Sequence, residues 1–386
     1  MKKTNKKLSL LLACGMVLGT AGCAGAQAGA VNPEKGYQAT ITSSMQGETV
    51  ALLGGAIGDF AANYTKGCAK QYAEEVLMVD RFAPKPATIT WENSREGALY
   101  YTLRVGLEKD LSDAEGYLVP DSSANIEYLF AAKHYYYQIY AHYEGNEVVK
   151  SRVFDFYTAD LPRTVLIEGV SNTRDIGGRY VQGGKYQVKQ GMVYRGGEAD
   201  KSWGNITEEG KRVFLYELGI KTDLDLRDRL TYTQSPIDSS LNYINVSAPY
   251  YVGNNGINDE SYKAALTTEI RTFANPDNYP IYLHCSLGRD RAGTLAYLVS
   301  ALIGVEEADL YRDYETSFFS VNGWADAQQS VGKHSELMAA IDRLHHYIKD
   351  YGTGTLQENT EKFVKEYLHI TDAEVQAIRS ILLEEV

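Results

Sequence analysis

The stretch from residue 284 to 294, His-Cys-Ser-Leu-Gly-Arg-Asp-Arg-Ala-Gly-Thr, constrains this chain most, because it joins two apolar segments of different type. Residues 281–284 favour a buried strand, and residues 295–303 favour an apolar helix. A glycine-bearing turn lies between them, with Cys285 at its start and Arg291 six positions later. A buried strand flanked by helices predicts a mixed α/β domain whose ligand site lies at the carboxyl ends of its strands.

The turn has the features of a phosphate site. Backbone N–H groups at a helix N-terminus point toward a bound anion, and the helix dipole adds partial positive charge. The same field favours the thiolate form of a cysteine placed there. The planar guanidinium of Arg291 can hold two phosphate oxygens. We therefore predict that Cys285 attacks phosphorus and that Arg291 holds the transferred group; the alternative is a core thiol beside an ion pair.

Three motifs are similar to those of the bacterial tyrosine and phosphoinositide phosphatases, a cysteine-dependent family. The loop at 284–294 resembles their His-Cys-x-x-Gly-Lys-Asp-Arg-Thr-Gly signature, residues 172–178 resemble Asn-x-Arg-Asp-Leu-Gly-Gly, and residues 219–227 resemble Gly-Ile-x-x-x-x-Asp-Leu-Arg. The resemblance implies a cysteine phosphatase fold, with a central sheet flanked by helices and a helical C-terminal part. It also implies hydrolysis of phosphate monoesters through a phosphocysteine.

The resemblance implies roles for single residues. Asp290 is the first candidate for the acid that protonates the leaving group, and Asp259, upstream of the loop, is the second. Substrate contacts are expected from the other loop residues, which are His284, Ser286, Leu287, Gly288, Arg289 and Ala292. The residues expected to support the loop from behind are Asp175, Arg195 and Thr294. Arg227 is equally well explained as a structural ion pair.

Two loop positions depart from the family pattern. Arg289 replaces the usual lysine and keeps a positive charge, which suits a second phosphate such as that of an inositol headgroup. Ala292 stands where the family carries serine or threonine, whose hydroxyl stabilises the thiolate that leaves the phosphoenzyme. The sequence therefore supports formation of the phosphocysteine better than its hydrolysis.

The first 31 residues predict export rather than a folded element. Lysines are frequent in residues 2–7, residues 8–18 are apolar, and small residues follow up to Cys23. The apolar run is too short to span a membrane. The segment at 21–23 resembles a bacterial lipobox, which makes Cys23 the expected lipidated residue and places the protein on the outer face of the cell membrane. Cleavage at residues 26–28, Ala-Gln-Ala, is the alternative and predicts a secreted protein.

Two of the four cysteines, Cys14 and Cys23, lie in this leader. A disulfide between the other two, Cys68 and Cys285, is formally allowed outside the cytosol. Such a disulfide would leave Cys285 without the free thiol that it needs to act as a nucleophile. We therefore predict that both thiols are free.

The length of 386 residues predicts more than one domain. Residues 32–80 give no functional signal. Residues 81–160 change to a period of two, in the manner of a β-sandwich, and Trp91 and Tyr135 resemble the core tryptophan and the corner tyrosine of fibronectin type III domains. The predicted strands there are residues 87–91, 100–105, 126–130, 134–143 and 149–157.

Residues 161–386 form the predicted catalytic domain. Its predicted strands are residues 165–167, 192–194, 221–226, 243–246 and 281–284. Helices are predicted from Thr207 to residue 218 and over residues 260–273, and the chain is expected to be helical after Gly304, with a capping box at Thr371.

The net charge of −12, without a basic run in the body, argues against a nucleic-acid partner. The seven histidines lack the spacing of metal ligands, so we expect neither a metal nor another cofactor. The expected substrates are a phosphorylated protein, a phosphoinositide or an inositol phosphate, and the sandwich offers a surface for a further partner. The alternatives are a phytase-like inositol polyphosphate phosphatase and a surface pseudophosphatase that only binds phosphorylated ligands.

Because Ala292 lacks a hydroxyl, hydrolysis of the phosphocysteine is expected to limit turnover. Stopped-flow measurement with p-nitrophenyl phosphate should show a product burst equal to the enzyme concentration, followed by a slow steady state. Ala292→Ser should raise the steady-state rate about tenfold, the effect of one hydrogen bond, and leave the burst amplitude unchanged. A linear progress curve at high turnover would show that Ala292 is harmless.

Overall fold

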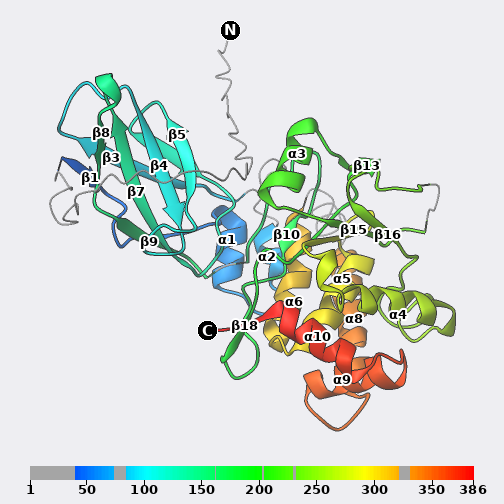
Figure 1. The fold of residues 1–386 in the computed structure, drawn as a ribbon. Helices are drawn as coiled ribbons and strands as arrows, with labels where there is room; N and C mark the ends of the chain where they lie inside the picture. Colours follow the sequence, from blue (N-terminus) through cyan, green and yellow to red (C-terminus); the bar gives the residue numbers. More distant parts are fainter. Residues whose placement is uncertain (1–39, 74–83, 161, 202–203, 229–231, 321–330) are drawn as a thin grey trace. The chain divides into compact units, whose positions relative to one another are not determined.

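The structure is a computed structural model that describes residues 40–73, 84–160, 162–201, 204–228, 232–320 and 331–386 (Figure 1). The predicted leader, with Cys23 and both cleavage sites, lies outside these residues. No helix in the described ranges is both long and apolar enough to cross a membrane.

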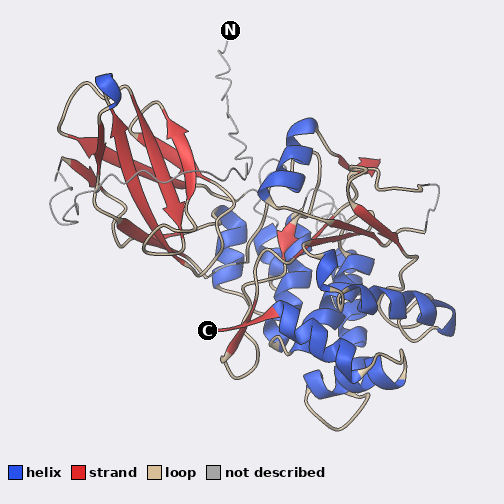
Figure 2. Cartoon of the chain, in the orientation of Figure 1, coloured by secondary structure: helices blue, strands red, loops and turns tan. Residues whose placement is uncertain are grey.

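A five-stranded sheet forms the centre of the α/β part, with helices on its two faces (Figure 2). Its order is β10 (Arg174–Asp175), β12 (Val193–Gly196), β17 (Ile281–His284), β15 (Thr222–Asp225) and β16 (Asn242–Asn245). The last four strands are parallel, and β10 is an antiparallel edge strand on β12. The predicted central sheet is confirmed, and the strand that leads into the loop at 284–294 lies in its middle.

Successive side chains along β17 point to opposite faces of the sheet. Ile281 and Leu283 enter the main hydrophobic cluster of the α/β part. Tyr282 and His284 lie on the opposite face, with their rings stacked 5.5 Å apart. The next residue, Cys285, therefore returns to the side of the main cluster, where it is 3% exposed.

Helices complete both faces of the sheet. Opposite the main cluster, α3 (Glu208–Arg212) continues as the π-helical turn η3 (Val213–Glu217). The remaining helices are η4 (Glu260–Tyr262), α4 (Lys263–Thr272), η5 (Pro276–Asn278), α5 (Asp290–Ile303), α6 (Glu307–Thr316), η6 (Ser317–Phe319), α8 (Val331–Lys349), α9 (Leu356–Glu366) and α10 (Asp372–Leu382). The predicted caps are confirmed: Thr207 accepts an N–H of α3, and Thr371 forms a capping box.

The described part of residues 32–80, the segment that gives no functional signal in the sequence, contributes to the same core. Helices α1 (Gly55–Ala62) and α2 (Ala69–Ala73) place Phe60 and Cys68 in the main cluster. The carboxylate of Glu315 in α6 accepts hydrogen bonds from Tyr64 Oη at 2.7 Å and from the N–H of Gly67 at 2.8 Å. The N-terminal helices are therefore part of the α/β core, although the chain leaves this core again before residue 161.

Two further sheets are built from residues between 41 and 158. One has the order β1 (Ile41–Ser43), β3 (Ala87–Asn93), β6 (Ser123–Ile126). The other has the order β2 (Thr49–Val50), β9 (Phe154–Thr158), β7 (His134–His142), β4 (Tyr100–Gly106), β5 (Glu115–Val119), with β8 (Val148–Lys150) also paired to β7. Their buried side chains form one hydrophobic cluster.

Two small ladders remain. Strand β11 (Tyr186–Val188) pairs with β18 (Leu383–Glu385), and β13 (Asp200–Lys201) pairs with β14 (Gly204–Asn205). The first of these ties the C-terminal strand to the chain near the start of the α/β part.

Several strand predictions are wrong for local reasons. The segment at 126–130 keeps only its first residue in β6, because Tyr128 has φ +60° and ends the extended chain. The segment at 149–157 splits into β8 and β9. The segment at 165–167 forms only isolated bridges. Strand β5 was not predicted, because its exposed residues show little apolar alternation.

Glu269 of α4 is a buried acid, and one of its carboxyl oxygens has no hydrogen-bond partner among the described residues. Its side chain is 1% exposed, and Oε1 has no hydrogen bond. Burial raises the pKa of Glu269 to about 8, from a usual value of 4.5. The folded protein therefore binds this proton more tightly than the unfolded chain, and it loses stability as the pH rises from 4.5 through 8.

Glu269→Gln should remove this pH dependence. We expect the variant to be more stable than the wild type at pH 9, by at most about 5 kcal/mol, with the difference shrinking toward pH 5. Urea unfolding at pH 5, 7 and 9 measures it. A difference that is constant across this range would show that folding does not raise the pKa of Glu269.

Candidate active site

The loop after β17 forms a tight turn that closes on the neighbouring strand. Gly288 has φ +70°, and a Cβ atom there would lie 2.3 Å from the carbonyl oxygen of Gly196 at the end of β12. Only glycine meets both conditions. The turn between Cys285 and α5 is thereby pressed against the carboxyl edge of the sheet.

The carbonyl groups of the loop are held from outside. Ser286 O accepts the N–H of Glu198 at 3.1 Å, Leu287 O accepts Asn172 Nδ2 at 2.9 Å, and Gly288 O accepts Arg195 Nη2 at 2.7 Å. Among the described residues, no backbone hydrogen bond uses the N–H of residues 286, 287 or 288 as its donor. Helix α5 also starts without a side-chain cap. The loop therefore offers its N–H groups to an anion.

A buried charge centre supports this arrangement. Asp313 of α6 accepts from Arg174 Nε at 2.9 Å and from Arg179 Nη2 at 2.7 Å, and it also pairs with Arg195. Burial opposes ionisation of Asp313, but the three guanidiniums outweigh it and hold the pKa of Asp313 well below its usual range. Because Arg195 also binds the loop carbonyls, this centre connects α6 to the loop.

Arg289 and Asp290 pair with each other. Arg289 Nε lies 3.0 Å from Asp290 Oδ1, and Arg289 Nη2 lies 3.2 Å from Oδ2. The Arg289 side chain is 6% exposed. The expectation that Arg289 keeps a positive charge at the mouth is therefore not met in this structure: the guanidinium is buried against the neighbouring carboxylate.

Arg291 is the more open of the two loop arginines. Its side chain is 24% exposed, and its Nη2 lies 3.4 Å from Asp228 Oδ2. Asp228 follows β15, is 55% exposed, and accepts a hydrogen bond from Ser247. The guanidinium expected to bind phosphate is thus paired with an exposed carboxylate.

His284 lies behind the loop. Its Nε2 is 3.0 Å from Asp223 and 3.8 Å from Asp225, both on the same face of β15, and its Nδ1 is 3.4 Å from Cys285 O. Burial opposes protonation, but the two carboxylates raise the pKa of His284. This position favours orientation of the loop over contact with a substrate.

The remaining three residues predicted for the site are Ala292, Thr294 and Asp175. Ala292 is buried at the start of α5, and Thr294 Oγ1 accepts the N–H of Tyr251 at 2.9 Å. Asp175 accepts the N–H groups of Gly177 and Gly191 rather than a loop group. These contacts support the chain around the loop.

Asp259 and Arg227 are engaged elsewhere. The carboxylate of Asp259 caps its own turn and accepts from Ser261 and from the N–H of Asn255, which lower its pKa. Arg227 pairs with three carboxylates, those of Asp225, Glu198 and Asp200. The Arg227 contacts are those of a structural ion pair.

The sequence did not reveal four residues of the site, namely Asp228, Tyr251, Asp313 and Tyr314. Asp228 directly follows the Asp-Leu-Arg motif and was within reach of motif reasoning. The other three come from segments without a catalytic pattern, and only the fold brings them to the loop.

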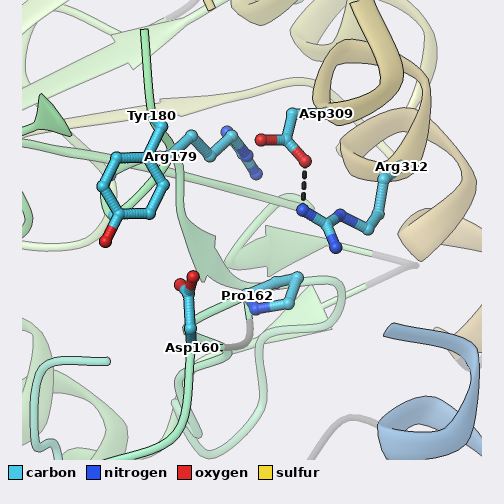
Figure 3. Close-up of a pocket in the computed structure, with 8 residues that line it drawn as sticks. Asp160, Pro162, Arg179, Tyr180, Asp309 and Arg312 are labelled. Carbon is cyan, nitrogen blue, oxygen red and sulfur yellow. Dashed lines mark hydrogen bonds and ion pairs between the residues drawn. The ribbon is translucent and has the colours of Figure 1, made fainter. Parts of the chain in front are cut away.

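No group of three or more His, Cys, Asp or Glu side chains among the described residues is arranged to hold a metal ion. Figure 3 shows residues that line a cavity of about 30 Å³. Its lining residues are Asp160, Pro162, Gly177, Gly178, Arg179, Tyr180, Asp309 and Arg312. None of them belongs to the loop at 284–294, so this cavity is not the phosphate site.

A thiol that directly follows a central parallel strand, in a loop whose carbonyls are bound by neighbouring groups, fits the arrangement expected of a cysteine phosphatase. The model of the tyrosine phosphatase family matches residues 165–384, more than half of the chain. The chain belongs to the tyrosine phosphatase family. The protein is therefore a phosphatase of the cysteine-based type, and the matched residues include the sheet, the loop and the helices that follow it.

Two solved structures are similar to part of this phosphatase. The core catalytic domain of the PP-IP phosphatase SIW14 from S. cerevisiae, in complex with citrate, is 19% identical, with a TM-score of 0.27, over 41% of this chain and 85% of that chain. Another structure of the Siw14 catalytic core is 17% identical, with a TM-score of 0.24, over 39% and 88%. No curated protein matches the chain.

The ion pair between Asp228 and Arg291 should compete with phosphate. Asp228→Asn removes the competing carboxylate, so the inhibition constant for inorganic phosphate should fall by a factor of up to about five, because an exposed ion pair contributes about 0–1 kcal/mol. Competition assays with p-nitrophenyl phosphate measure it. Asp277→Asn, with the same charge change at the amino end of β17, is the matched control. Weaker phosphate binding by Asp228→Asn alone would contradict the competition.

Proposed function

We propose that this phosphatase hydrolyses phosphate monoesters, with phosphotyrosine as its preferred substrate class, through a phosphocysteine on Cys285. The observation that carries the proposal is the loop geometry: the carbonyls of residues 286–288 are held outward, and Cys285 sits at the start of the turn. The N–H groups and Arg291 then bind the three non-bridging oxygens, where charge accumulates in the transition state.

The proposed reaction has two steps. The Cys285 thiolate forms a bond to phosphorus while the bond to the leaving oxygen breaks, and Asp290 gives its proton to that oxygen. Water then attacks phosphorus and returns a proton to Asp290, and the Sγ–P bond breaks to release phosphate and the thiolate. Asp290 is preferred to Asp259 because it lies within the loop, whereas the Asp259 carboxylate caps its own turn.

The charges around the loop support a single phosphate rather than a polyphosphate. In the described part of the site, Arg289 pairs with Asp290 and Arg291 pairs with Asp228. Each loop arginine therefore has a carboxylate beside it, and the whole chain carries a net charge of −12. A polyanionic inositol phosphate needs an excess of cations, which this balance does not favour. Phosphoinositides with one accessible phosphate remain within the proposed range.

The proposal includes the location of the enzyme and the role of its N-terminal half. The leader and Cys23 support an exported, lipid-anchored protein, with secretion as the alternative. A fibronectin type III-like sandwich at 81–160 is supported by the burial of Trp91 and by the Tyr135 hydroxyl, which accepts the N–H of Phe130 at 2.8 Å. Such a module would hold the α/β part, which comprises residues 161–386 together with helices α1 and α2, away from the membrane or contact a surface partner.

Activity toward four substrates tests the function. We expect turnover of a phosphotyrosine peptide to exceed that of a phosphoserine peptide, a phosphatidylinositol phosphate and inositol hexakisphosphate. Cys285→Ser should abolish all turnover, whereas Cys68→Ala, at the other described thiol, should retain it. Vanadate should inhibit, and EDTA should not. Activity that survives in Cys285→Ser would overturn the mechanism, and tight binding without turnover would indicate a pseudophosphatase. Preference for inositol hexakisphosphate would indicate the phytase-like alternative.

A further inference from the structure

The proposed acid, Asp290, is held by a pair of buried tyrosines. Tyr251 Oη lies 2.5 Å from Asp290 Oδ1 and 2.5 Å from Tyr314 Oη. The Tyr251 and Tyr314 side chains are 7% and 1% exposed, and their rings meet edge to face with centroids 6.2 Å apart. The three groups form one continuous hydrogen-bonded chain from α6 to the first residue of α5.

The donor and the acceptor in each of these hydrogen bonds follow from the hydroxyl protons that are available. Tyr251 has a single hydroxyl proton, and a carboxylate can only accept it. Tyr251 therefore donates to Asp290, and Tyr314 donates to the Tyr251 oxygen. Burial, the neighbouring Tyr314 and Asp290 all raise the pKa of Tyr251, so this hydroxyl keeps its proton at neutral pH.

The two oxygens of Asp290 differ in their partners. Oδ1 receives Tyr251 Oη at 2.5 Å and Arg289 Nε at 3.0 Å, whereas Oδ2 receives Arg289 Nη2 at 3.2 Å. An oxygen that already accepts two short hydrogen bonds has little capacity left for a proton. Oδ2, which accepts one longer hydrogen bond, is therefore the oxygen that can take up and pass on a proton.

Tyr251 is itself fixed in an unusual conformation. Its φ is +57°, a region that tyrosine rarely adopts, and the surrounding contacts hold it there. Its N–H donates to Thr294 Oγ1 at 2.9 Å, and its carbonyl accepts the N–H of Ile257 at 3.0 Å. Thr294 belongs to the same helix as Asp290, one turn later. The segment before η4 is thus tied to α5 at both the backbone and the hydroxyl of one residue.

We propose that Tyr251, backed by Tyr314, is a positioning residue that locks the Asp290 carboxylate and leaves Oδ2 to protonate the leaving group. This inference rests on the proposed acid role of Asp290. Tyr251 touches neither the substrate nor the nucleophile in this account. It acts by preventing rotation of the carboxylate and of the guanidinium of Arg289 that is paired with it.

Tyr251→Phe tests the proposal, because it keeps the ring and removes only the hydroxyl. We expect kcat for phenyl phosphate, which has a poor leaving group, to fall about tenfold or more, and kcat for p-nitrophenyl phosphate to fall less than about threefold. The KM values should change less than about twofold. Tyr314→Phe keeps the bond between Tyr251 and Asp290, so it should show the same selectivity with a smaller loss.

The double variant Tyr251→Phe/Asp290→Asn shows whether Tyr251 acts through Asp290. Adding Tyr251→Phe to Asp290→Asn should cause no further loss on either substrate. Losses that multiply in the double variant would overturn the proposal, as would an equal loss on both substrates in Tyr251→Phe. Circular dichroism and the thermal midpoint of each variant separate these results from unfolding.

Failure of the acid role would be visible separately. If Asp290→Asn reduces turnover of both substrates equally, Asp290 is not the acid and the proposed mechanism changes. That result would also overturn the positioning role, because the role consists in holding Asp290 as the acid. Activity that survives in Cys285→Ser would overturn the proposed function itself.

Discussion

The carboxylate of Asp313 is the interaction on which the catalytic loop depends. Three buried guanidiniums surround it, those of Arg174, Arg179 and Arg195. Without this carboxylate they would repel one another in a region that excludes water, so its loss leaves several uncompensated charges. With it, the arginines become rigid donors. Arg195 reaches the loop carbonyls directly, and Arg174 bonds to Asn172 Oδ1 at 2.7 Å, which directs the Asn172 amide toward Leu287 O. The loop proposed to bind the anion is thus held by groups that contact its carbonyls.

The sequence predicted what local patterns can carry. Cys285, Arg291 and the strand before them are close together in the chain, and the alternation around Leu283 and the capping box at Thr371 are equally local. Residues such as Asp313 could not be found in this way. It lies in an amphipathic helix among ordinary polar residues, and its role depends on partners more than 100 positions away, as its hydrogen bonds to the three arginines show.

The sequence also could not show which charged residues are buried. A charged residue in a loop suggests exposure, yet Arg289 is 6% exposed because Asp290 is beside it to accept its guanidinium. The same holds for β15, where Asp223 and Asp225 are fully buried on one face of a strand that reads as half polar. Their cost is offset by Arg227, two residues after Asp225, and by His284, whose position follows from the strand order. The polar face of β15 is thereby a support for the loop rather than a solvent-exposed face.

The N-terminal helical segment forms contacts in the α/β core with residues that are far away in the sequence. Tyr64 and Glu315 are 251 residues apart in the sequence and form a hydrogen bond. Glu315 lies in α6, the helix that also carries Asp313 and Tyr314. Closing a loop of this length is a late event in folding, because its entropy is lost before its contacts are gained. The helix that supports the nucleophile's loop therefore completes its contacts only after both ends of a long chain segment exist. The contacts of α6 therefore join residues from both ends of a long chain segment, so the surroundings of the loop belong to the whole α/β core rather than to the signature alone.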